Sequence, residues 1–231
     1  MGGGGFDTVS HGAYPVYRLV GTEGMTTEAK AKEGRTTRDG IISVAARLIL
    51  VKGYNSTSVD DILRETGIGK GNFYYYFKSK EDLGYAILDR AIRSFVERTL
   101  EPCFSDPDGD RLKQVRCFLD RLLETQRERN CVGGCPMGNL ASELSDVHEG
   151  FRARLTEVFT LWRTRLTQAL EEGGARGEVS AGCRPAATAQ FLVASLEGAI
   201  LMTKVSRDIG VMEQCVNELK QYLSLYDGSG R

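Results

Sequence analysis

The sequence TSVDDILRETGIGKGNFYYYF, residues 57–77, restricts the fold more than any other part of the chain. Ser58 is a good helix N-cap, and Asp61 three residues later can complete a capping box. Gly67 is placed to end this short helix, and a further helix follows at about 70–76. Two short helices joined by a glycine-bearing turn predict a helix-turn-helix, whose second helix fits the major groove of DNA with its N-terminal residues leading.

The second of these helices opens with Lys70, Gly71 and Asn72 and continues into five aromatic residues. Lysine can donate to guanine or phosphate, asparagine can pair with adenine, and glycine lets backbone approach a ligand closely. The N–H groups at a helix N-terminus can also bind phosphate. Phe73 and Phe77 are four residues apart, so we expect both in the core.

Three tyrosines cannot share that buried face, so at least one hydroxyl must point outward and can bond phosphate. Two lysines follow at the start of the next helix, where we expect them to hold phosphates. An alternative interpretation is that the tyrosines are half-buried packing and the lysines a solvated rim. The three tyrosines are Tyr74, Tyr75 and Tyr76, and the two lysines are Lys78 and Lys80.

Charge is distributed unevenly along the chain. Residues 35–80 contain eight basic and four acidic side chains, a net charge of +4, so with an overall charge of −1 the remainder carries −5. A basic module joined to an acidic body suggests that only one part of the chain meets phosphate.

The segment 57–83 resembles the DNA-binding segment of the TetR family of bacterial transcriptional repressors. The family pattern is matched at Thr57, Ser58, Val59, Asp61, Ile62, Gly67, Ile68, Gly71, Phe73, Tyr74, Tyr76, Phe77, Lys80 and Leu83. One mild departure is Leu63, where the family often has alanine. The resemblance covers roughly residues 35–95.

The resemblance implies an all-helical homodimer with a three-helix DNA-binding domain and a larger helical regulatory domain. It implies DNA contacts from Lys70, Gly71, Asn72, Tyr74, Tyr75 and Tyr76. It also implies that Lys80 and the helix start at Thr57, Ser58 and Val59 hold the DNA backbone.

The rest of the chain reads as helices, so the predicted fold class is all-α. A helix from Thr36 to Gly53 should precede the helix-turn-helix, and one from Ser79 to Leu100 should follow it and stop near Pro102. Later spans are expected at about 110–129, 136–147, 149–172, 185–206 and 210–226. We therefore expect a disordered extension (1–34), a DNA-binding domain (35–95, with the motif at about 58–77) and a sensing and dimerisation domain (96–231).

Composition favours a cytoplasmic protein. We find no signal peptide, and translation starts at Met1 or Met25. The six cysteines are scattered, which favours reduced thiols. The segment 186–205 reaches membrane-spanning length, but Glu197 inside it would be costly in a membrane, so we interpret it as a buried helix and expect no membrane partner.

Two helices have patterns suited to dimerisation. Residues 151–170 carry an apolar stripe, and 186–205 offers the small residues Ala194, Ser195, Gly198 and Ala199, which let helices approach closely. Burial inside one subunit is the alternative for both. We favour the interface for the second helix, because a protein that reads a two-fold operator must itself be two-fold.

The string CVGGCPMGNLASELSD, residues 131–146, suggests a sensing site. Pro136 suits a first helical turn, so Cys135 falls at a helix N-cap, where the helix dipole should lower its pKa. The segment is similar to one in a subgroup of TetR-type repressors that answer electrophiles through a cysteine. A buried structural cysteine is the alternative, and a zinc site is weaker because His148 is the only histidine nearby.

A second sensing hypothesis is an apolar pocket lined by Phe118, Met137 and Trp162. We expect no cofactor, no metal and no catalysis, since no nucleophile–base pair stands out. The sequence thus predicts a regulator, a repressor that binds a near-palindromic double-stranded operator as a homodimer and is released by a small-molecule or electrophilic inducer. The alternative is a helical dimeric interaction module without sequence-specific DNA binding.

Overall fold

A computed structural model describes residues 38–228 of the chain; the predicted extension 1–34 and both candidate start methionines lie outside them. The described residues form helices, and the β-type pairing among them is one isolated bridge between Val179 and Asp227. The predicted all-α class is confirmed. The helices are α2 (Arg38–Lys52), α3 (Val59–Thr66), α4 (Lys70–Tyr76), α5 (Lys80–Phe95), η1 (Val96–Leu100), α6 (Glu101–Phe104), α7 (Arg111–Glu128), α8 (Pro136–Leu144), α9 (Glu149–Ala175), α10 (Pro185–Ser206) and α11 (Ile209–Ser224).

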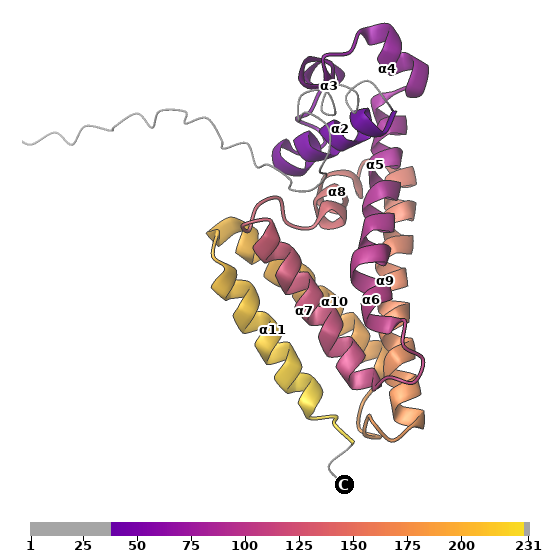
Figure 1. Cartoon of the computed structure of the whole chain (residues 1–231), viewed down its shortest axis with the longest axis vertical. Helices are drawn as coiled ribbons and strands as arrows, with labels where there is room; N and C mark the ends of the chain where they lie inside the picture. Colours follow the sequence, from indigo (N-terminus) through magenta and orange to yellow (C-terminus); the bar gives the residue numbers. More distant parts are fainter. Residues whose placement is uncertain (1–37, 229–231) are drawn as a thin grey trace, which may run out of the picture.

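Helices α2, α3 and α4 gather at one end of the molecule, and we call this group the head (Figure 1). The Ser58 side chain accepts the N–H of Asp61 while the Asp61 carboxylate accepts the N–H of Ser58, so the predicted capping box is confirmed. Gly67 ends α3 in the left-handed conformation, with φ at 71°. The head packs on its own apolar residues, which include Ile41, Ala45, Ile62, Phe73 and Phe77.

The helix that leaves the head is longer than predicted. Ser79 caps α5 as expected, by accepting the N–H of Asp82. Beyond Phe95 the chain continues through the π-helical η1 into α6 and passes Pro102, which lies in the first turn of α6. Proline is tolerated in a first turn because its missing N–H has no partner to lose there.

The other helices form the body, in which α10 packs on both α9 and α11, and α7 also contacts these two helices. Their bounds agree with the predicted spans to within three residues. Helix α8 lies between the head and the long body helices (Figure 1).

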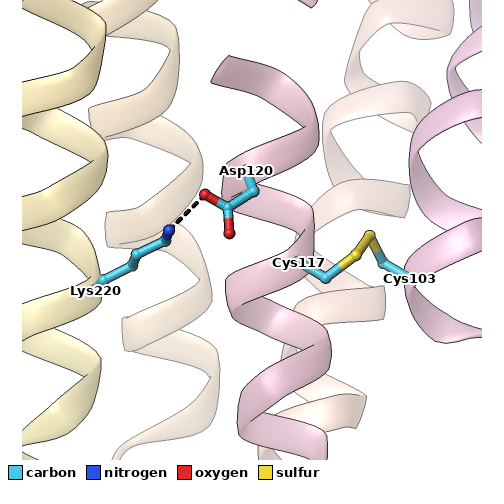
Figure 2. The surroundings of a disulfide bond; sticks show 4 residues. All are labelled: Cys103, Cys117, Asp120 and Lys220. Atoms are coloured by element: carbon cyan, nitrogen blue, oxygen red, sulfur yellow. Dashed lines mark hydrogen bonds and ion pairs between the residues drawn. A yellow bond between two sulfur atoms is a disulfide. The ribbon is translucent and has the colours of Figure 1, made fainter. Parts of the chain in front are cut away.

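One cysteine prediction is wrong. Cys103 of α6 and Cys117 of α7 are joined by a disulfide that ties the end of the α5–η1–α6 segment to α7 (Figure 2). Spacing along the chain did not predict this pair, because the approach of α6 to α7 brings the two sulfurs together. On the far side of α7, Asp120 pairs with Lys220 of α11.

Helix α10 is long and apolar enough to cross a membrane by length and composition alone. It packs between α9 and α11, and eight of its residues are buried there. Glu197 is also largely enclosed within the body.

Candidate nucleic-acid interface

Helix α4 presents one buried and one exposed face. Phe73 and Phe77 are fully buried, as predicted. Tyr75 is 80 % exposed and Tyr74 46 % exposed, whereas Tyr76 is half-buried with its ring 4.9 Å from that of Tyr75. The prediction that at least one tyrosine points outward is therefore confirmed.

Polar side chains lie at both ends of this exposed face, with Lys70 and Asn72 in the first turn of α4 and Lys78 beyond its C-terminal end. The side chains of Lys70, Asn72 and Lys78 are all exposed to solvent. A cluster of two lysines, an amide and outward tyrosines offers donors both to phosphates and to base edges.

The glycines at the start of α4 are not required by packing inside the chain. A Cβ added at Gly69 or Gly71 would meet no atom within 4 Å, and neither glycine has a positive φ. Gly69 is the N-cap of α4 and supplies no side-chain hydrogen bond to the first turn. The absent side chains leave the backbone open to a ligand that approaches closely.

The start of α3 also lies near the surface. Ser58 is exposed, but its backbone N–H and hydroxyl are both bonded to Asp61, and these bonds lower the pKa of the Asp61 carboxyl. Val59 is half-buried against the core.

Two predicted DNA contacts differ in the structure. Thr57 is fully buried, and its hydroxyl donates to the Gly53 carbonyl at 2.7 Å, so its side chain braces the α2–α3 turn instead of facing DNA. The Lys80 ammonium lies over the Tyr54 ring, 4.3 Å from its centroid, and desolvation there lowers the pKa of Lys80. The Lys80 contact depends on how the turn that carries Tyr54 folds back on α5, which the sequence could not show, whereas the Thr57 bond spans only four residues.

Cys135 lies at the predicted helix N-cap, but the pKa of its thiol differs from the prediction. Cys135 is the N-cap of α8, and its sulfur accepts the Gly138 N–H at 3.3 Å. Burial raises the pKa of the Cys135 thiol, and the Glu197 carboxylate of α10 raises it further. The predicted fall in pKa is wrong, because desolvation and a neighbouring negative charge outweigh the helix N-terminus.

Glu197 itself is unusual. Burial raises the pKa of its carboxyl, and its Oε1 atom is buried without a hydrogen-bond partner in the protein. An unsatisfied polar atom of this kind is costly in a folded protein. Glu197 also lines a groove of about 370 Å³ between α8, α9 and α10, together with Arg152 and Phe159.

The three residues of the second sensing hypothesis are all buried. Trp162 stacks on Phe95 with ring centroids 4.2 Å apart and meets Phe118 edge-on at 6.3 Å. These rings fill the core, and two grooves on the surface of residues 38–228, one of them the groove beside Glu197, are lined neither by these rings nor by Met137. Within the same residues there is no group of three His, Cys, Asp or Glu side chains suited to a metal ion.

Sequence reasoning missed one surface on α10. Beside the exposed Ala194 and Gly198, this helix also leaves large apolar side chains in solvent, and we call this surface the α10 face. Ala199, by contrast, faces the core. Ala194, Gly198, Leu201 and Val205 follow one another at intervals of four, three and four positions, so small and large apolar residues share one side of the helix. The large exposed residues are Phe191, Leu201, Met202 and Val205.

The long helix α9 leaves fewer large apolar side chains in solvent, among them Leu161, which is 41 % exposed. Its apolar stripe, which includes Leu155, Trp162 and Leu166, is buried within its own subunit. This stripe packs inside the subunit, as in the alternative interpretation of this helix, and its role in dimerisation stays a prediction.

Comparisons with known proteins agree with this architecture. The family model for bacterial regulatory proteins of the tetR family matches residues 41–85, and that for the tetracyclin repressor-like C-terminal domain matches residues 111–219. An uncharacterised HTH-type transcriptional regulator of Lactococcus lactis is 34 % identical over 80 % of this chain and 92 % of its own length.

Two further proteins are similar in sequence and in structure. The HTH-type transcriptional repressor NemR of Escherichia coli is 26 % identical over 81 % of this chain and 94 % of its own; the structure of its reduced form has a TM-score of 0.70, covering 83 % and 96 % of the two chains. A TetR transcriptional regulator from Chloroflexus aurantiacus has a TM-score of 0.76 at 29 % identity, covering 86 % of this chain and 98 % of its own.

Replacing Gly71 with alanine should weaken DNA binding without harming the fold. The added methyl group has free space within the chain and favours a helix, so the melting temperature should stay equal or rise. Close approach of DNA to this backbone would be blocked, and we expect affinity to fall by about fivefold or more, roughly 1 kcal/mol. Fluorescence anisotropy with duplex DNA and a thermal melt measure the two effects.

Gly174→Ala, in open space on α9, is the matched control. Equal affinities of the Gly71→Ala and Gly174→Ala variants for duplex DNA would contradict the role of Gly71.

Proposed function

The chain belongs to the TetR family of bacterial transcriptional regulators, and from that membership we propose that it is a repressor that binds a near-palindromic operator as a homodimer. It is a DNA-binding regulator; the family consists of regulators, which are generally not enzymes. The alternative of an interaction module without sequence-specific binding is not favoured. As a soluble DNA-binding protein it would act in the cytoplasm, with residues 35–95 on DNA and residues 96–231 sensing and pairing.

The exposed face of α4 carries this proposal. Its leading end offers Lys70 and Asn72 to the major groove, and Tyr75 is more exposed than the other large apolar or aromatic side chains of the head. We assign base contacts to Lys70, Gly71 and Asn72. Phosphate contacts would come from Lys78, the tyrosines and the backbone near Ser58 and Val59.

A pair of substitutions separates base reading from phosphate binding. Asn72→Ala should change which bases are preferred, with losses of about 1–3 kcal/mol at the base it reads. Lys78→Ala should weaken binding to all sequences alike and reduce the slope of log affinity against log salt by about one. Selection from random duplexes, followed by titration at several salt concentrations, measures both. If the two variants lose affinity uniformly, the assignment of Asn72 is wrong.

We propose that the α10 face is the subunit interface. Val205 is 78 % exposed and Leu201 and Met202 are each 58 % exposed, which is uncommon for a row of large apolar side chains on one helix. The exposed Ala194 and Gly198 lie on the same helix, where they would let a symmetric partner helix approach closely. Pairing through α10 would place two heads on one duplex.

Glutamate at Leu201 or Val205 should convert the dimer to monomers. A buried, unpaired carboxylate in an apolar interface is strongly unfavourable, while the outward position leaves the subunit's own core intact. Sedimentation at micromolar concentration should show half the mass, and affinity for a two-half-site duplex should fall by at least about tenfold, or 1.4 kcal/mol. Val147→Glu, at an exposed position before α9, is the control and should remain dimeric. A dimeric Leu201→Glu variant would place the interface elsewhere.

For release from DNA we propose an inducer that reacts with or binds beside Cys135. This thiol meets Glu197 of α10, the helix proposed to pair the subunits, so a change at Cys135 would disturb the interface that sets the spacing of the two heads. The structure of the relative NemR is described as that of its reduced form. A non-covalent ligand near Phe118, Met137 and Trp162 is the second candidate, and it would require the core to open.

Cys135→Ser distinguishes the two inducer classes. In the wild-type protein, N-ethylmaleimide should release duplex DNA, and more quickly at pH 8 than at pH 7, because a thiol of raised pKa gains thiolate as pH rises. The Cys135→Ser variant should stay bound. Cys215→Ser, which removes another free thiol, should respond as the wild type does. Release that persists in Cys135→Ser would exclude the thiol mechanism and favour the pocket.

A further inference from the structure

The Glu143 carboxylate of the body binds two backbone N–H groups of the turn that joins α2 and α3 in the head. The Glu143 side chain of α8 accepts the N–H of Tyr54 through Oε1 and the N–H of Asn55 through Oε2, each at 2.8 Å. The residues are 88 and 89 positions apart in sequence. Both carboxylate oxygens are engaged by adjacent amides, a bidentate arrangement in which each bond is charge-assisted and strong.

The turn at Gly53, Tyr54 and Asn55 also packs closely against this carboxylate. Gly53 has a φ of +90°, and a Cβ added there would lie 2.9 Å from Oε1 of Glu143. Position 53 therefore favours glycine for two reasons, its backbone conformation and the carboxylate beside it. The Tyr54 side chain is buried edge-on against Phe151 of α9, and burial raises its pKa to about 12.

Hydrogen bonds connect this turn to the start of α3, the first helix of the predicted helix-turn-helix. The Thr57 hydroxyl donates to the Gly53 carbonyl, and the Thr57 N–H donates to the Tyr54 carbonyl at 3.2 Å. The next residue is Ser58, the cap of α3. Two residues thus separate Asn55 from the cap, and hydrogen bonds span the interval, so holding the turn fixes where α3 begins.

The opposite side of α8 is held by the body. Asn139 accepts a hydrogen bond from the Lys204 ammonium of α10 at 3.0 Å and donates to the Gly133 carbonyl at 2.7 Å. Cys135, at the start of α8, meets Glu197 of α10. Helix α8 is accordingly bonded at one end to the proposed pairing helix and at the other to the head.

We propose that Glu143 is a positioning residue for DNA binding: its carboxylate fixes the head on α8 and so sets the distance between the two reading helices of the dimer. It does not touch DNA, and it would act through the turn at Tyr54 and Asn55. The proposal rests on dimeric operator binding as set out above.

Glu143→Gln tests the clamp without DNA. The amide keeps the shape of the side chain but offers one acceptor where the carboxylate offers two, and its NH₂ group would face a backbone donor. Hydrogen exchange at the Tyr54 and Asn55 amides should accelerate by at least about tenfold, as expected when a charge-assisted bond is lost. Asp146→Asn removes the same charge from an exposed position three residues along and is the matched control. Equal exchange in the two variants would overturn the proposal.

A second measurement tests positioning. Duplexes selected from a random library by the wild-type protein are remade with one or two base pairs inserted or removed between the half-sites. The wild type should discriminate strongly against the altered spacings, and Glu143→Gln should reduce that discrimination by about tenfold while its salt dependence stays unchanged. A merely structural role would leave the spacing preference at its wild-type value, and that result would also overturn the proposal.

Two outcomes keep the proposals separable. If Glu143→Gln does not fold, Glu143→Asp replaces it, since that change keeps the charge and withdraws the carboxylate by one methylene; the same shifts are expected. If the wild type selects single half-sites only, dimeric operator binding is wrong and the spacing role of Glu143 falls with it, while accelerated exchange would still establish the clamp itself.

Discussion

The DNA-facing surface depends on the burial of Phe73 and Phe77. Helix α4 has seven residues, and an isolated helix of that length is not stable in water. The two rings, whose centroids are 5.8 Å apart, anchor one side of α4 in the core of the head. Every polar group on the other side, from Lys70 to Tyr75, takes its direction from that anchorage.

Local chemistry was predictable and long-range chemistry was not. The caps at Ser58, Ser79 and Cys135 and the stop at Gly67 follow from residues at most three positions apart, and the structure contains all of them. The pKa of Cys135 was predicted in the wrong direction, because the thiol is buried by the packed body and lies beside Glu197, which is distant in sequence. The buried hydroxyl of Thr57 was missed although its acceptor, Gly53, is only four residues away, because a family pattern names the position but not where its side chain points.

Helix α10 shows how one composition can serve two purposes. Its inner face packs against α9 and α11, and its outer face leaves Leu201, Met202 and Val205 in solvent. A helix that is apolar all round resembles a membrane span in sequence, and a helix buried on one side by its own chain and on the other by a partner has the same composition. The enclosed Glu197 makes the second interpretation the more consistent one.

The π-helical segment η1 determines which side chains of the connecting helix meet solvent. The N–H of Glu101 bonds to the carbonyl of Val96, five residues back, so this turn contains one residue more than an α-helical turn. An extra residue advances the following side chains by about 100° around the axis, which leaves Arg98 and Pro102 outside while Leu100 and Phe104 turn inward. Loss of a single residue between Val96 and Leu100 would put the two halves of this connection out of phase, whereas most substitutions there would not.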